Sequence, residues 1–219
     1  MICMMALKPW DDRPHPKRGD RKATTTYAAV GQALSQWEGL ETKLAELFSQ
    51  LVGGEWPGGD ERPYHPAVRA YGSVLGSAAR LTMIEEAAKA HFHWHPNPGL
   101  ERRLKDFIGT QCRNFATKRN NIAHGVVDIR FSDPPRLKMG YWLVPSLYAS
   151  KKNPLDGPNA YAYTSAEIVY FIKEFDRLWV TACELISEIS RDQTRTTPPC
   201  CRLSNAFKTN STNCRRRHW

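Results

Sequence analysis

The stretch Glu101–Gly125, ERRLKDFIGTQCRNFATKRNNIAHG, has the apolar periodicity of an amphipathic helix. Its apolar side chains recur at steps of three and four residues and form one stripe: Leu104, Phe107, Ile108, Cys112, Phe115 and Ile122. Arg119 falls inside this stripe, so its guanidinium must enter or border the packed interior. Because an unpaired buried charge is unfavourable, Arg119 requires a partner or a function. Gly125 can adopt a positive φ and is expected to end the helix.

The end of this helix carries a short polar motif. Arg119, the polar Asn120, three further residues and His124 resemble the Arg-polar-x-x-x-His signature of the HEPN superfamily. The form Arg-Asn-x-x-Ala-His-Gly, residues 119–125, resembles members associated with toxin–antitoxin and abortive-infection (antiviral defence) systems. The resemblance implies an all-α fold and, in such a system, an antitoxin partner.

HEPN nucleases, as the resemblance implies, cleave RNA without a metal ion and leave 2′,3′-cyclic phosphate ends. Their His assists proton transfer as the ribose 2′-hydroxyl attacks the phosphate, and their Arg stabilises the anionic transition state. Imidazole titrates near neutral pH, and a guanidinium donates paired hydrogen bonds to phosphate oxygens. The resemblance therefore predicts an endoribonuclease that needs neither metal nor other cofactor. The predicted catalytic residues are Arg119, Asn120 and His124, and the predicted contacts to nucleic acid are Arg113, Lys118 and Asn121.

The spacing within the motif bears on the oligomeric state. His124 lies five residues after Arg119 and therefore about 140° further round an ideal helix. One helix cannot easily direct both groups at one phosphate, whereas two antiparallel copies can present both pairs to a shared cleft. Family members usually form this site across a dimer, so we expect a homodimer.

Three further amphipathic segments complete the predicted domain, residues 24–190. The first starts at three threonine hydroxyls, which are candidate N-caps, and covers residues 24–51. The second runs over about residues 67–92 between prolines. The last begins at a capping box, Thr164-Ser165-Ala166-Glu167. With the helix that carries the motif, these segments predict an all-α fold, a four-helix up-and-down bundle.

A change of period after the motif indicates a small β insertion. Residues 126–131 alternate between apolar and polar side chains, and residues 132–135 form a turn signal. Residues 137–144 then have the composition of a partner strand. We therefore expect a β-hairpin between the third and fourth helices.

Arg80, on the second predicted helix, lies near that helix's apolar stripe. Its closest candidate partners are Glu38 and Glu41 on the polar face of the first helix. We expect a structural ion pair with one of them.

Alternating histidines end the second helix: His91, His93 and His95. They suggest a metal site, but alternation suits a strand better than a helix, and no carboxylate or cysteine is interleaved. A favourable interaction with the helix dipole is the simpler interpretation. We predict no metal.

The net charge of +9 is concentrated in two tails. Residues 1–23 carry six basic and three acidic side chains, and residues 191–219 carry seven basic side chains and one acidic. Both segments are predicted to be disordered basic tails. They suit contact with a polyanion such as RNA, and equally suit plain solvated ends.

The remaining composition favours a cytoplasmic protein. No apolar run reaches the roughly 18 residues that a membrane span requires, and the N-terminus lacks the features of a signal peptide. Of the six cysteines, Cys112 and Cys183 fall on apolar helical stripes and the others lie in the tails. We expect reduced thiols and no membrane partner.

Three functional interpretations follow. The first is an RNA-cleaving HEPN dimer. The second is a catalytically silent HEPN-like module that binds nucleic acid or a protein, in which Arg119 and His124 form an ion-pair and capping system. The third is an unrelated helical bundle that matches the motif by chance.

Overall fold

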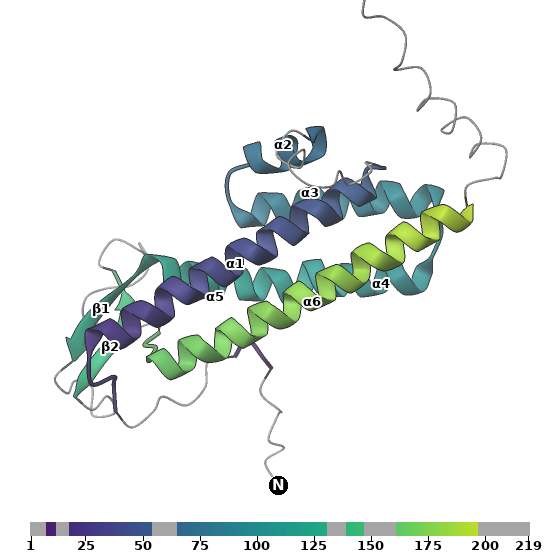
Figure 1. The fold of residues 1–219 in the computed structure, drawn as a ribbon. Helices are drawn as coiled ribbons and strands as arrows, with labels where there is room; N and C mark the ends of the chain where they lie inside the picture. The colour runs from purple at the N-terminus through teal and green to yellow at the C-terminus, as the bar shows by residue number, and fades with distance from the viewer. Residues whose placement is uncertain (1–7, 12–17, 54–64, 131–138, 147–160, 197–219) are drawn as a thin grey trace, which may run out of the picture.

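The computed structural model describes residues 8–11, 18–53, 65–130, 139–146 and 161–196, and it is mostly helical with one small sheet (Figure 1). The all-α class predicted from the sequence is confirmed at this level. The elements, in chain order, are α1 Ala23–Leu51, α2 Pro66–Ser73, α3 Ser77–Trp94, α4 Pro98–Asp106, the π-helical segment η2 Phe107–Cys112, α5 Arg113–His124, β1 Gly125–Arg130, β2 Gly140–Pro145 and α6 Ser165–Thr196.

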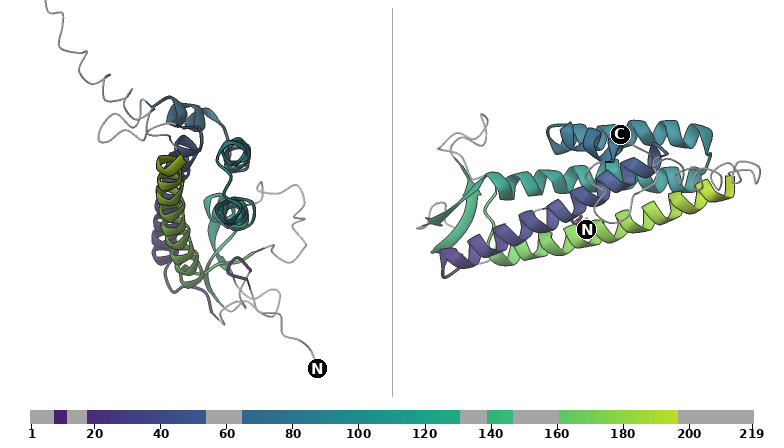
Figure 2. Two further views of the ribbon diagram at one scale, coloured as in Figure 1. Left: turned by 90° about the vertical axis from the view of Figure 1, so that its right-hand side faces the viewer. Right: turned by 45° about the horizontal axis from the view of Figure 1, so that its top comes forward.

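The long helices α1 and α6 form one layer, and α3 and the α4–η2–α5 rod form the other (Figure 2). The core between the layers is aromatic and aliphatic: Trp37 of α1 and Phe175 of α6 are fully buried and meet edge to face, with ring centroids 5.1 Å apart. Phe115 of α5 packs on Phe175 from the opposite layer. The six apolar side chains of the stripe in Glu101–Gly125 are all buried, as their periodicity predicts.

The direction of the helices differs from the predicted up-and-down bundle. Gln36 of α1 bonds Asp176 of α6, and Lys43 lies over the ring of Trp179, so α1 and α6 run parallel. Figure 1 shows both helices starting at the β-hairpin and running to the opposite end of the molecule. The α4–η2–α5 rod runs the other way, and so does the short α2, since His65 at its start lies by Ser49 and Tyr71 near its end bonds Glu41.

A break in the second predicted helix explains this topology. Val74 has an extended backbone and Gly76 a φ of +86°, so α2 ends and α3 begins in a new direction. Glycine adopts such a φ without the steric penalty of a Cβ atom. The guanidinium of Arg80 donates a 3.0 Å hydrogen bond to the Val74 carbonyl, which stabilises the turn between α2 and α3. The turn lets α3 run in the same direction as α1.

The β-hairpin is confirmed, and its register pairs Gly125 with Pro145 and Arg130 with Gly140. Two isolated bridges extend it: Asp20 pairs with Tyr141, and Tyr163 pairs with Leu143. The hairpin therefore joins the segment before α1 and the segment before α6 to the end of α5.

The Thr164 N–H donates to the Glu167 carboxylate, which is the glutamate half of the capping box predicted at the start of α6, and the Thr164 hydroxyl donates to the same oxygen. The start of α1 differs from the prediction. The helix begins at Ala23, and the hydroxyl of Thr26 donates to Asp20 instead of capping the helix. Asp20 also accepts two hydrogen bonds from Ser165, so one carboxylate joins the first turns of α1 and α6.

The predicted tail 1–23 is in part packed on the domain. Trp10 meets Phe115 edge to face at 6.1 Å, and Pro9 accepts a hydrogen bond from the Tyr170 hydroxyl. Helix α6 extends past the predicted boundary at residue 190 to Thr196, and the predicted tail beyond it lies outside the described residues. No helix among the described residues is long and apolar enough to cross a membrane.

Candidate functional site

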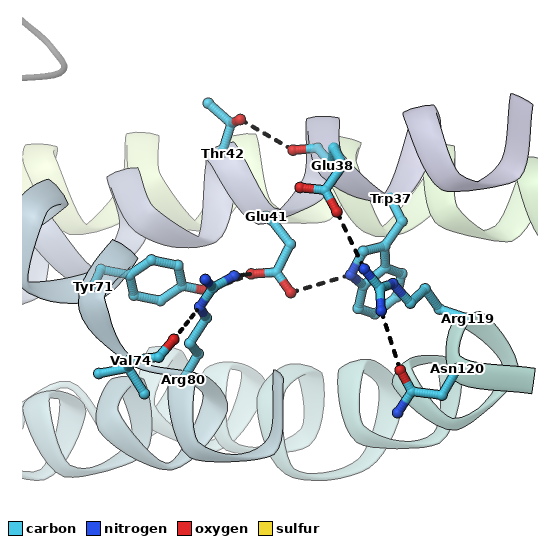
Figure 3. Close-up of polar contacts among 9 residues, drawn as sticks. All are labelled: Trp37, Glu38, Glu41, Thr42, Tyr71, Val74, Arg80, Arg119 and Asn120. Atoms are coloured by element: carbon cyan, nitrogen blue, oxygen red, sulfur yellow. Dashed lines mark hydrogen bonds and ion pairs between the residues drawn. The ribbon is translucent and has the colours of Figure 1, made fainter. Parts of the chain in front are cut away.

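Arg119 of α5 reaches across to α1. Its Nη2 atom lies 3.3 Å from Oε1 of Glu38, and its Nη1 donates a 3.3 Å hydrogen bond to Oδ1 of Asn120 (Figure 3). Nε is buried and meets no acceptor among the described residues. The side chain is 27% exposed, so the guanidinium borders the interior as the apolar stripe predicts, and Glu38 is the partner that its charge requires.

The contact to Glu38 is weak. The Glu38 side chain is 64% exposed, and the 3.3 Å distance is longer than the 2.7–2.9 Å typical of a strong charge-assisted hydrogen bond. Exposed pairs of this kind contribute at most about 1 kcal/mol to stability, because water competes for both charges. Glu38 therefore positions the Arg119 guanidinium, but this contact can be broken at little cost in free energy.

The next turn of α1 carries a second glutamate in a different setting. Glu41 is buried and accepts hydrogen bonds from Trp37 Nε1 at 3.1 Å, the Tyr71 hydroxyl at 3.0 Å and Arg80 Nη1 at 3.3 Å (Figure 3). The ion pair predicted for Arg80 is thus confirmed, with Glu41 as its partner. Burial, with the Glu41 charge, raises the pKa of Tyr71, so its hydroxyl stays protonated. This cluster joins α1, α2 and α3 and is structural.

His124 is the last residue of α5 and is exposed. Within the described part of the chain, no hydrogen bond or ion pair reaches its imidazole. Asn120, one helical turn earlier, is also exposed. Because residues 113–124 form a regular α-helix, Arg119 and His124 differ by about 7.5 Å along its axis and about 140° around it.

Gly125 ends the helix by a route that differs from the prediction. Its φ of −79° and ψ of 161° are extended values that any residue adopts, so a positive φ is not needed. A Cβ atom there would lie 2.8 Å from two side-chain atoms of Leu143 and 3.0 Å from the carbonyl oxygen of Asn121. Glycine is required because β2 approaches the chain closely at this point.

The three predicted contacts to nucleic acid all have protein partners. Arg113 forms a 2.6 Å ion pair with Glu85 of α3. Lys118 is buried, with Nζ 5.9 Å from the ring centroid of Phe171 on α6. Asn121 donates to the Tyr163 hydroxyl, and its carbonyl accepts from Tyr161. Of the six predicted site residues, Asn120 and His124 are exposed at the end of α5, and Arg119 is partly buried and contacts Glu38 and Asn120.

Sequence reasoning missed two residues beside the motif, Tyr161 and Tyr163. They lie about forty residues further along the chain, in a short segment without helical or strand periodicity, so nothing local in the sequence connects them with α5. The bridge from Tyr163 to Leu143 and the hydrogen bonds of both hydroxyls to Asn121 place them there.

The three histidines at the end of α3 do not gather around a common point. His91 is buried and packs against the ring of His95 at 5.0 Å, whereas His93 is exposed. Burial, followed by the charge of His95, lowers the pKa of His91. Among the described residues, no group of three metal-ligating side chains could hold an ion.

A surface groove of about 680 Å³ lies between α3 and the α4–η2 rod. Ala88, Leu104 and Ile108 contribute apolar lining, and the charged lining is mixed in sign, including Glu85, Lys89 and Lys105. The groove contains neither Arg119 nor His124.

Comparisons of the chain with protein-family models, with curated proteins and with solved structures found no match. A function for this chain is therefore inferred from residues 119–125 and from the geometry around them.

Proposed function

We propose that this chain is a metal-independent endoribonuclease of the HEPN type, in which Arg119 binds the scissile phosphate and His124 transfers a proton. The observation that carries the proposal is the exposure of the His124 side chain together with the weak contacts of the Arg119 guanidinium. His124 is exposed at the end of α5, and the guanidinium of Arg119, five residues earlier, is held by contacts weak enough to be exchanged.

A phosphate can displace Glu38 from Arg119. The guanidinium presents a planar fork that matches two phosphate oxygens, and such bidentate pairs are shorter and about twice as strong as neutral hydrogen bonds. Glu38 offers one oxygen at 3.3 Å from an exposed carboxylate. Asn120 holds the other side of the fork, so Arg119 is oriented before the substrate arrives.

The proposed reaction is a transfer within the RNA. The 2′-hydroxyl oxygen forms a bond to phosphorus while the bond from phosphorus to the 5′-oxygen breaks. The 2′-hydroxyl proton passes to a base, and the leaving 5′-oxygen receives a proton. An imidazole can serve in either transfer near neutral pH. Arg119 stabilises the extra negative charge on the phosphate oxygens in the transition state.

The site is proposed to be completed by a second copy. An offset of about 140° and about 7.5 Å keeps one chain from directing both groups at a single phosphate. Two α5 helices related by a two-fold axis would place both pairs in one cleft. Light scattering at micromolar concentration tests this part, and a monomer would contradict it.

The deciding experiment compares the wild-type protein with His124→Ala and Arg119→Lys on a mixed RNA pool in EDTA. We expect the wild type to leave 2′,3′-cyclic phosphate ends and to spare DNA, which lacks the 2′-hydroxyl. Losing the proton-transfer group should lower the rate by about 10²–10⁴. The Lys variant should also lose most activity, since an ammonium cannot reproduce the fork.

Two matched controls separate chemistry from general damage. His93→Ala removes another exposed histidine near a helix end, and Arg103→Lys alters another arginine paired with a surface glutamate. Both should cleave at the wild-type rate. Cleavage that survives in the two motif variants, or that requires added metal, would overturn the proposal.

A second candidate function is a catalytically silent module that binds nucleic acid or a protein. The contacts of Arg119 with both Glu38 and Asn120 favour it, because they are also what a structural arginine would make. Here the wild type does not cleave RNA, and both motif substitutions lower the melting temperature. A role in a toxin–antitoxin pair or in phage defence rests on the family resemblance, and co-purification with a neighbouring gene product tests it.

A further inference from the structure

Two stacked tyrosines hold the last turn of α5. The rings of Tyr161 and Tyr163 lie 5.0 Å apart at an angle of 18°, and both residues are buried. The Tyr161 hydroxyl donates a 2.9 Å hydrogen bond to the carbonyl of Asn121. The Asn121 side-chain amide donates to the Tyr163 hydroxyl at 3.3 Å. One residue of the motif is therefore bound through both its backbone and its side chain.

This contact lies where a helix is weakest. The last four carbonyls of a helix lack intrahelical donors, and the final turn frays when nothing replaces them. Asn121 is among those four residues of α5, and Tyr161 supplies a donor. Burial raises the pKa of Tyr161 to about 12, so this donor is retained throughout the neutral range.

The same tyrosine pair also fixes the chain just after His124. Tyr163 exchanges two backbone hydrogen bonds with Leu143 of β2, at 2.8 and 2.9 Å. The Leu143 side chain in turn packs on Gly125, where a Cβ atom would lie only 2.8 Å away. His124 thus sits between two fixed points, Asn121 three residues before it and Gly125 directly after it.

We propose that Tyr161 and Tyr163 are positioning residues for His124, acting through Asn121 and Gly125. The catalytic consequence rests on the proposed ribonuclease function, while the structural consequence does not. The two tyrosines and their hydrogen bonds to Asn121 form a clamp on the end of α5. Without this clamp, the backbone of His124 samples more orientations at the end of a fraying helix. A misplacement of about 1 Å can cost about 10²-fold in rate even when the reacting groups are intact.

The test uses Tyr161→Phe and Tyr163→Phe, which keep the stacked rings and remove only the hydroxyls. Tyr170→Phe is the matched control, because Tyr170 lies on α6 and its hydroxyl bonds the Pro9 carbonyl instead of Asn121. Asn121→Ala, which removes the side-chain bond to Tyr163 and keeps the carbonyl that Tyr161 bonds, provides a second route if Tyr163→Phe does not fold. Each variant of the full-length chain is measured for RNA cleavage and for amide hydrogen exchange.

We expect Tyr161→Phe to lower kcat about 10–100-fold with little change in KM, since phosphate binding by Arg119 is untouched. Tyr163→Phe should have a smaller effect, because its hydrogen bond is longer. In a His124→Ala background neither change should lower the rate further. A purely structural role predicts losses that persist in that background.

Hydrogen exchange separates failure of this inference from failure of the proposed function. Exchange at the amides of residues 122–125 should accelerate in Tyr161→Phe and stay unchanged in Tyr170→Phe, whether or not the protein cleaves RNA. Faster exchange in a protein that never cleaves would overturn the ribonuclease proposal and keep the clamp. Unchanged exchange and unchanged kcat in both tyrosine variants would overturn the clamp.

Discussion

Arg119 and Arg80 both reach α1 and pair with glutamates three residues apart, Glu38 and Glu41, yet the two pairs differ in exposure. The Glu38 side chain is 64% exposed and the Glu41 side chain 8% exposed, although both ion pairs measure 3.3 Å. Desolvation determines how much each contact resists exchange. The Glu41 pair belongs to the core, and the Glu38 carboxylate remains exposed to solvent.

Replacing Glu38 by Gln should strengthen RNA binding. In the proposed site the Glu38 carboxylate competes with phosphate for Arg119, so removing its charge should give a several-fold lower KM and almost unchanged stability. Steady-state cleavage kinetics and thermal unfolding measure the two effects. Glu188→Gln is the matched control, because Glu188 pairs with Arg103 on another face. A KM that rises or stays constant would show that Glu38 does not compete with the substrate.

Replacing Arg80 by Ala should destabilise the fold without involving the motif. The change leaves the buried carboxylate of Glu41 without its counter-charge and opens the break between α2 and α3. Removing one partner of a buried pair typically costs about 3–5 kcal/mol, and the partial exposure of Arg80 places this case at the lower end. Urea unfolding measures it. Arg103→Ala, at an exposed pair, should change the free energy of unfolding by less than about 1 kcal/mol.

Replacing Gly125 by Ala should destabilise the protein, because the added Cβ atom would lie too close to the Leu143 side chain. Its backbone is extended, so the cost comes from the contact with Leu143 and is expected to be about 1–3 kcal/mol. Gly39→Ala is an informative control, since no atom lies within 4 Å of a Cβ at that position in α1. That change should stabilise the protein by about 0.5–1 kcal/mol. Equal effects at the two glycines would contradict the close approach of β2.

The stability of the protein should fall as the pH drops below about 6.5, the usual pKa of histidine. Burial first, and then the charge of His95, lowers the pKa of His91 in the folded state. The unfolded chain therefore binds a proton at a higher pH than the folded one, and the contribution of His91 is lost as the pH falls toward its folded pKa. Melting temperatures between pH 7 and pH 5 measure this. His91→Gln should flatten the dependence, whereas His93→Gln, at an exposed site, should leave it unchanged.

The apolar stripe of residues 101–125 predicted which side chains of this helix are buried, and it placed Arg119 at the border of the core. It could not show the π-helical segment Phe107–Cys112, because an extra residue in one turn leaves no mark on a pattern of three- and four-residue steps. The sequence also left open whether Arg80 pairs with Glu38 or with Glu41, and it named no partner for Arg119, since both contacts depend on how α3 and α5 lie against α1.

The sequence by itself determined the helical class, the hairpin, the capping box at α6 and the polar motif at the end of α5. Each depends on residues close together in the chain, whose spacing and hydrogen-bonding groups act locally. Tertiary structure alone decided the parallel course of α1 and α6, the need for glycine at position 125, and the contact of Tyr161 and Tyr163 with Asn121. These depend on close approach between segments far apart in the chain, which local periodicity does not encode.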